Sequence, residues 1–97
     1  MKEIKLIEYF DPFAENKERA RKLRVEVLMP TLEKGEEIIL DFDGIVGVTQ
    51  SFIHALISDL FRKFGAGVLD RVSFKNCNDK VKSVIATVSD YMQAAEW

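Results

Sequence analysis

The chain has 97 residues, of which 47% are hydrophobic and 31% charged, a balance typical of one small globular domain and not of a disordered segment. Its formal net charge of −2 provides no overall attraction to nucleic acid or to an anionic membrane. The single cysteine, Cys77, excludes an intramolecular disulfide and a cysteine-rich zinc site.

The first two elements in chain order are a strand and a long helix. Within residues 3–10, Ile4 and Leu6 lie two apart with Lys5 between them, which is the period of a strand, and the aromatic residues add to this preference. Residues 17–34 carry apolar residues at steps of three and four, which predicts a helix with Asn16 as N-cap and Gly35 just past its end. Pro30 lies inside this helix and removes a backbone donor, so we expect a kink or two abutting helices.

A second strand and the most hydrophobic helix follow. Residues 37–42 are apolar on both faces, which indicates a central strand covered, at least in part, on both sides. Residues 50–64 form a helix that Gly65 ends, and its apolar arc approaches half of the circumference. Either Ile53 and Phe61 complete the core, or they form an exposed rim for a partner or a dimer.

A third strand and a third helix are expected in the last part of the chain. Residues 71–75 alternate like a short strand, and a helix runs from about residue 79 to about residue 93. Three side chains are candidates for its N-cap, namely Asn76, Asn78 and Asp79. Its apolar stripe consists of Val81, Val84, Ile85, Val88, Met92 and Ala95.

Alternation of strands and helices predicts an α/β fold over residues 1–97 as a single domain. The order strand–helix–strand–helix–strand–helix favours a three- to four-stranded, mostly parallel or mixed sheet packed with three helices. A fourth short strand would fall in residues 44–49 or 66–70. No apolar run reaches the roughly 20 residues that span a bilayer, and no signal peptide is recognised, so we expect a cytoplasmic protein without a membrane partner.

Two carboxylates, Asp41 and Asp43, come at the end of the second predicted strand. No histidine, nucleophile or further ligand accompanies them at a recognisable spacing, so we predict neither an acid–base pair nor a metal site, and no cofactor. Arg24 falls on the apolar stripe of the first helix, where an unpaired guanidinium is costly. We therefore predict a structural ion pair between Arg24 and Asp41 or Asp43.

The remaining reactive side chains do not form a catalytic set. His54 is the only histidine and lies on the polar face of its helix, and Cys77 lies in a loop without a paired histidine. Hence the sequence predicts that the chain is not an enzyme. The basic run over residues 17–24 is interleaved with glutamates and lacks stacking aromatics, which favours a solvated helix over nucleic-acid binding.

Thr49, Gln50 and Ser51 precede or open the second helix. Their side chains are candidates for capping the helix, and the exposed N–H groups of a helix N-terminus are candidates for contact with a partner. The two roles are compatible, because one hydroxyl can cap while its neighbours make contacts.

Residues 40–52, with the sequence LDFDGIVGVTQSF, carry a recognisable pattern. The string resembles the STAS-like domain family of unknown function, in which a strand ends in Asp-Phe-(Asp/Glu)-Gly-Val and Ser-Phe opens the next helix. Residues 23–35 resemble the helix that precedes this strand in the family, and the resemblance extends over roughly residues 17–92. It implies a small STAS-like α/β domain.

The parent STAS fold includes anti-sigma-factor antagonists, whose equivalent loop carries a serine that a partner kinase phosphorylates. Gln50 occupies that position here, so the resemblance does not extend to the phosphoswitch. It implies a regulatory module that docks to a protein such as a histidine-kinase-like ATPase, with a small ligand- or nucleotide-binding sensor as the alternative and a homodimer left open. The partner-binding residues expected on this basis are Ile45, Gly47, Thr49, Gln50, Ser51 and His54.

Overall fold

The computed structural model describes residues 1–94, apart from the side chain of Ala66. The main sheet consists of β1 (Lys2–Lys5), β3 (Ile38–Asp41) and β5 (Val72–Lys75), and a second sheet joins β2 (Phe13–Ala14) to β4 (Gly47–Val48). The helices are α1 (Lys17–Leu23), α2 (Met29–Glu33), α3 (Gln50–Phe64) and α4 (Asp79–Ala94). A π-helical turn (Arg24–Leu28) joins α1 to α2, and 3-10 turns cover Leu6–Glu8 and Ala66–Asp70.

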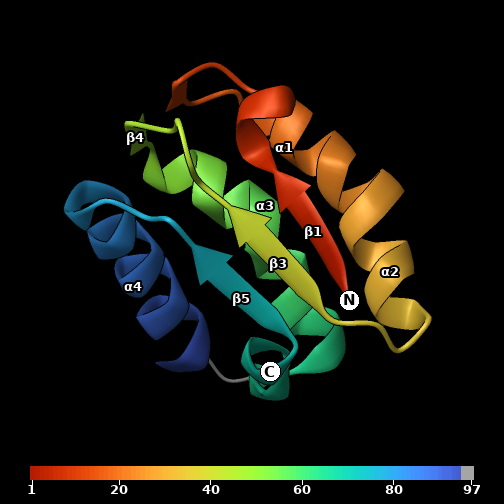
Figure 1. The fold of residues 1–97 in the computed structure, drawn as a ribbon. Coiled ribbons are helices and arrows are strands. Elements are labelled where there is room, and N and C mark those ends of the chain that lie inside the picture. Colours follow the sequence, from red (N-terminus) through yellow and green to blue (C-terminus); the bar gives the residue numbers. More distant parts are fainter. Residues whose placement is uncertain (95–97) are drawn as a thin grey trace.

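The three strands of the main sheet are parallel and lie in the order β1-β3-β5. Their register aligns Ile4 with Leu40 and Leu40 with Phe74. Right-handed crossovers between strands in this order place every connecting helix on the same face of the sheet. Figure 1 shows this arrangement, with the helices on one side of the sheet. The predicted α/β class and mostly parallel sheet are confirmed.

The core lies between this sheet and the helices, and α3 supplies its centre. Phe52, Leu56 and Leu60 are buried, and Phe52 meets Phe10 edge-on with ring centroids 4.8 Å apart. Ile53 and Phe61 are also buried. These two residues therefore complete the core, and the alternative of an exposed rim on α3 is wrong for them.

The opposite face of the main sheet has no helix over it. Ile39 on the central strand is half-buried on this face, and the ion pair between Lys75 Nζ and Glu3 Oε2, at 3.1 Å, joins the two edge strands across β3. The central strand is therefore covered by helices on one face and only in part on the other, where Ile39 is half-buried and Asp41 is buried. The aliphatic stem of Lys75 and the Glu3 side chain cross this face in place of a packed layer.

The long first helix contains the expected interruption at Pro30. Asn16 Oδ1 accepts hydrogen bonds from the N–H groups of Glu18 and Arg19, both at 3.1 Å, and so caps α1 as predicted. Pro30 lies in the first turn of α2, directly after the π-helical turn, in which the N–H of Met29 bonds the carbonyl of residue 24. Two abutting helices are thus observed, joined by a wider turn next to the residue that cannot donate.

The smaller differences concern short elements. The first strand ends at Lys5 and continues as a 3-10 turn. A short strand does occur within residues 44–49, but it pairs with β2 in a separate sheet, and residues 66–70 form a 3-10 turn. Asn78 caps α4, because its Oδ1 accepts the N–H of Val81 at 2.8 Å. The predicted stripe residue Ala95 lies outside the described residues. Within residues 1–94, no helix combines the length and apolar character needed to cross a membrane.

Candidate functional site

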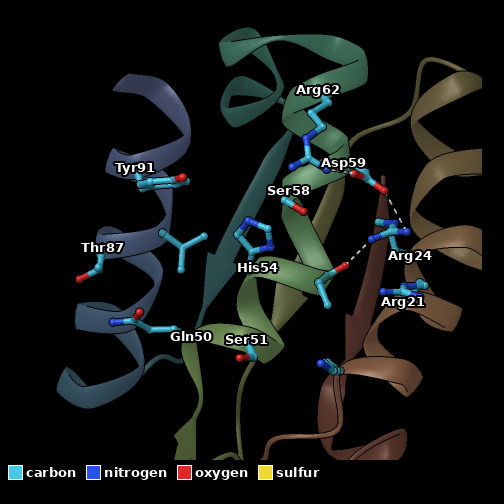
Figure 2. A pocket seen from close by; sticks show the side chains of 13 residues that line it. Arg21, Arg24, Gln50, Ser51, His54, Ser58, Asp59, Arg62, Thr87 and Tyr91 are labelled. Atoms are coloured by element: carbon cyan, nitrogen blue, oxygen red, sulfur yellow. Dashed lines mark hydrogen bonds and ion pairs between the residues drawn. The ribbon is translucent and has the colours of Figure 1, made fainter. Parts of the chain in front are cut away.

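A groove of about 890 Å³ runs along the outer side of α3, with α1 on one side and α4 on the other (Figure 2). We call it the helix groove. From α1 and the π-helical turn it is lined by Lys17, Arg21 and Arg24. From α3 it is lined by Gln50, Ser51, His54, Ala55, Ser58, Asp59 and Arg62, and from α4 by Thr87, Val88 and Tyr91.

The sequence of α3 explains why its outer side is polar. Its large apolar side chains from Phe52 to Phe61 are buried in the core, so most of the remaining positions recur at helical spacing on the opposite side. Gln50, His54 and Ser58 follow one another at steps of four and form one row along the floor of the helix groove. Figure 2 shows His54 directed toward the space between α3 and α4.

A buried arginine joins α1 to α3 at one wall of the groove. The Arg24 side chain is 10% exposed, its Nη1 donates to the Ala55 carbonyl at 2.7 Å, and its Nη2 lies 3.0 Å from Asp59 Oδ2. The other carboxylate oxygen, Oδ1, accepts from Arg62 Nη1 at 2.8 Å. Arg24 Nε is buried without a hydrogen-bond partner. One carboxylate therefore bridges two arginines (Figure 2).

The predicted burial and pairing of Arg24 are confirmed, but the predicted partner is wrong. Asp41 is in register with Lys5 and Lys75 on the face of the sheet that has no helices, so it cannot reach Arg24 on the helical side. Asp43 follows the strand and is exposed. The ion pair that the sequence assigned to a strand carboxylate is made by Asp59 of α3.

Asp41 instead stabilises the end of β3 through local hydrogen bonds. Its Oδ1 accepts from Asn76 Nδ2 and from the N–H of Asp43, each at 2.9 Å. These two hydrogen bonds favour the ionised carboxylate and hold the pKa of Asp41 below its ordinary value of 3.8. Asn76 adopts a positive φ of 58°, so this residue both turns the chain and donates to Asp41.

The six predicted partner-binding residues separate into three groups. Ile45 is buried in the core and Gly47 is buried next to the Phe13 ring, so neither offers a side chain to a partner. Thr49 caps α3, with its Oγ1 accepting the N–H of residue 52 at 3.1 Å. The last three residues line the helix groove: Gln50, Ser51 and His54.

The loop before α3 is fixed on two sides. The N–H of Val46 donates to the Pro12 carbonyl at 2.7 Å, and Asn78 Nδ2 donates to the Val46 carbonyl at 2.9 Å. Gly44 adopts a φ of +88°, and the Ile7 side chain lies across it. The Val46 side chain is 59% exposed, which makes it the accessible apolar residue of this loop. The loop over residues 45–51 is the docking surface expected from the sequence, but alternation alone does not show that Val46 is the loop residue that points outward.

Comparison with known proteins identifies the family. The model of the STAS-like domain of unknown function (DUF4325) matches residues 19–82, which include most of α1, all of α3 and the start of α4. The chain belongs to this STAS-like family. No curated protein and no solved structure matches it. The matched range includes the Arg24–Asp59 ion pair and begins after Lys17.

The reactive side chains of this STAS-like domain are not assembled into one hydrogen-bonded set in the described residues. No hydrogen bond joins His54 to Ser51 or Ser58 within residues 1–94, and no group of three potential metal-ligating side chains occurs in the part of the chain that the structure describes. Cys77 is partly buried, and this burial raises the pKa of its thiol, which disfavours the nucleophilic thiolate. The absence of catalysis remains a prediction.

The electrostatics of the helix groove were not predicted. Lys17 and Arg21 belong to the basic run that the sequence assigned to a solvated helix, and the structure places both beside α3. Arg62 and Tyr91 join them from later elements. The sequence signal was the four-residue spacing of Lys17 and Arg21, which sets both on one side of α1, but only the packing of α1 against α3 shows what that side faces.

Proposed function

We propose that this STAS-like domain is a non-catalytic regulatory module that binds a partner protein through the helix groove and the loop that leads into α3. The observation that carries the proposal is the position of Gln50, Ser51 and His54, which line an open groove on the surface of the central helix. Membership of the STAS-like family supports a regulatory role at the level of the fold.

A histidine-kinase-like ATPase is the partner class that we propose, because STAS-fold antagonists bind ATPases of this kind. Gln50 stands where those antagonists carry their phosphorylated serine, and a carboxamide does not accept a phosphoryl group. The neighbouring Thr49 hydroxyl already accepts a hydrogen bond as the helix cap. We therefore propose that binding is controlled by something other than phosphorylation of this turn.

The test is site-specific photo-crosslinking in the native host, with a benzophenone amino acid at Gln50. A matched probe at Ser73, exposed on the helix-free face of the sheet, is the control. We expect a defined protein to crosslink at Gln50 and not at Ser73. The captured protein is then purified, and its affinity for the domain is measured by calorimetry.

With the purified partner, Gln50→Trp should weaken binding by about tenfold or more, because a bulky uncharged side chain then fills the floor of the groove. The matched control, Ser73→Trp on the helix-free face of the sheet, should bind normally. Equal crosslinking at Gln50 and Ser73, or normal binding by Gln50→Trp, would contradict the proposal. A stoichiometric phosphate on Ser51 or Thr49 that releases the partner would restore a phosphate switch.

The second candidate function is a sensor for a small anionic ligand such as a nucleotide. The observation that favours it is the concentration of cationic side chains around a groove of about 890 Å³, a volume within the usual range for ligand sites. Titration of the pure protein with nucleoside triphosphates decides this point. Saturable micromolar binding would favour the sensor over the docking module.

A further inference from the structure

We propose that the part of the partner that occupies the helix groove is an acidic polypeptide segment. This inference rests on the proposed docking function and adds the chemistry of the bound segment. The charges that line the groove, their lack of compensation and the shape of the surface support it.

The helix groove is cationic in a chain that is acidic overall. Four basic side chains line it, namely those of Lys17, Arg21, Arg24 and Arg62. The only carboxylate among the lining residues is that of Asp59. The complete chain has 14 basic and 16 acidic residues. Positive charge is therefore concentrated on one surface and the rest of the molecule is more acidic than its net charge of −2 suggests.

The one carboxylate is already shared, so it leaves two cations uncompensated. Both oxygens of Asp59 are engaged, one by Arg24 and one by Arg62. Lys17 and Arg21 form no ion pair within 4.0 Å in residues 1–94. They lie one turn apart on the same side of α1, where two like charges destabilise a helix by a few tenths of a kcal/mol. A bound carboxylate would remove this repulsion.

The N-terminus of α3 adds partial positive charge at the same end of the groove. The first turn of α3 contains no acidic residue, whereas α1 and α4 each begin with one. The Thr49 side chain accepts the N–H of residue 52, and no acceptor within residues 1–94 takes the N–H groups of Gln50 and Ser51. The unpaired donors and the helix dipole both favour an anion here.

The shape of the groove favours a polypeptide over a small molecule. Its floor extends from Gln50 to Arg62, which is about 18 Å along the axis of α3. The surface is open along this length, and Tyr91, 68% exposed, supplies an apolar edge beside Val88. Acidic side chains next to an apolar one would match this mixture. A nucleic acid fits less well, because only one aromatic ring is offered for stacking and the rest of the chain repels a polyanion.

The test compares two double variants of α1 that alter the net charge equally. Lys17→Glu with Arg21→Glu reverses the groove wall, and Arg19→Glu with Lys22→Glu reverses exposed residues outside the groove. The probe is a fluorescent, glutamate-rich peptide of about 12 residues, a length that spans about 18 Å as a helix. A glutamine-substituted peptide and a single-stranded RNA of similar length are the comparison ligands.

We expect the acidic peptide to bind the native chain and to shift the backbone NMR signals of Gln50, Ser51 and Ala55. The groove variant should lose affinity about tenfold or more, and the matched variant less than about twofold. Equal losses in the two variants would indicate unspecific attraction and overturn the inference. Equal binding of the glutamine peptide, or tighter binding of the RNA, would also overturn it.

Binding of the purified crosslinked partner to the variants distinguishes failure of this inference from failure of the proposed function. If Gln50→Trp abolishes partner binding and the groove variant does not, docking stands and the acidic segment is wrong. Loss of binding in both Gln50→Trp and the groove variant, with normal binding in the matched variant, supports both proposals. If neither Gln50→Trp nor the groove variant affects binding, the partner uses another surface and both proposals fail.

Discussion

The guanidinium of Arg24 makes two contacts with α3. It donates a buried hydrogen bond to the Ala55 carbonyl, and it forms an ion pair with the partly exposed carboxylate of Asp59. Arg24→Ala removes a charge-assisted hydrogen bond to the Ala55 carbonyl, which contributes about 1.5–3 kcal/mol in comparable sites. Arg19→Ala and Lys22→Ala alter exposed side chains and should change the free energy of unfolding by less than about 0.5 kcal/mol. Urea denaturation of the three variants measures the difference, and equal small losses would contradict the burial of Arg24.

Asp41 provides a prediction in the acid range. Its pKa is lowered in the folded state, first by the hydrogen bond from Asn76 and then by the N–H of Asp43. A lowered carboxyl pKa contributes stability that is complete above the ordinary value of 3.8 and is lost as the pH falls through the folded-state pKa. In urea titrations from neutral pH to about pH 2, Asp41→Asn should therefore reduce the loss of stability on acidification.

Asn76 allows the hydrogen bond and the backbone turn to be separated. Asn76→Gly loses the hydrogen bond but accepts the positive φ, whereas Asn76→Ala also pays about 1–2 kcal/mol for the left-handed conformation. Both variants should show the weaker acid dependence, and Asn76→Ala should be the less stable. An unchanged acid profile in both would show that Asn76 does not control Asp41.

For single residues, burial could be predicted from the sequence more readily than the identity of the contact partner. The burial of Arg24 could be predicted from the helical phase, because Arg24 falls among the apolar positions of its helix. Its partner could not, since the choice between Asp59 and Asp41 depends on which face of the sheet the helices cover. Val46 and Gln50 lie in the loop before α3 and in its first turn. The local pattern could not show that Gln50 lines the helix groove while Val46 is exposed outside it.

At the scale of elements, α3 depends on its cap. Thr49→Ala removes the acceptor of one first-turn N–H and should cost about 1 kcal/mol, whereas Ser51→Ala should be nearly neutral. Thr49→Ala also removes a methyl group, so Thr49→Val, which keeps two γ atoms but lacks the hydroxyl, is the control for lost packing. Thermal unfolding measures the variants, and equal losses in Thr49→Ala and Ser51→Ala would show that Ser51 shares the cap.

Element boundaries were predictable where capping residues mark them. The predicted helix over residues 50–64 matches α3, and Asn16 and Asn78 cap α1 and α4. The two-residue strands β2 and β4 were not separable from loops, because alternation cannot be recognised in two residues. The π-helical turn was foreseen only as an interruption at Pro30, since the sequence shows the missing donor but not how the turn adapts.

The arrangement of the whole molecule predicts unequal protection of the three parallel strands. β3 is hydrogen-bonded on both sides, while β1 and β5 are the edges of the main sheet. Amide hydrogens of β3 should exchange at least about tenfold more slowly than those of the edges, as central strands open only with larger parts of the fold. Hydrogen exchange followed by NMR tests this, and equal protection of β1 in solution would indicate that another chain covers that edge.

The alternation of elements predicted the α/β class, and the connection rule for parallel strands then places the helices on one face of the sheet. The partial cover of the central strand on the other face has a different origin. Ile39 is half-buried there without a helix over it, and the ion pair between Glu3 and Lys75 crosses the same face. Because these partners are far apart in the sequence, no local pattern could reveal the bridge.

The strands of the main sheet lie in space in the order in which they occur in the chain. During synthesis from the N-terminus, β1 and β3 are therefore available to pair before β5 leaves the ribosome. Each later strand adds to the same growing edge, and none has to be inserted between two strands that are already paired. The nascent chain thus extends its sheet in one direction. The ion pair between Lys75 and Glu3 forms only after the last strand has docked.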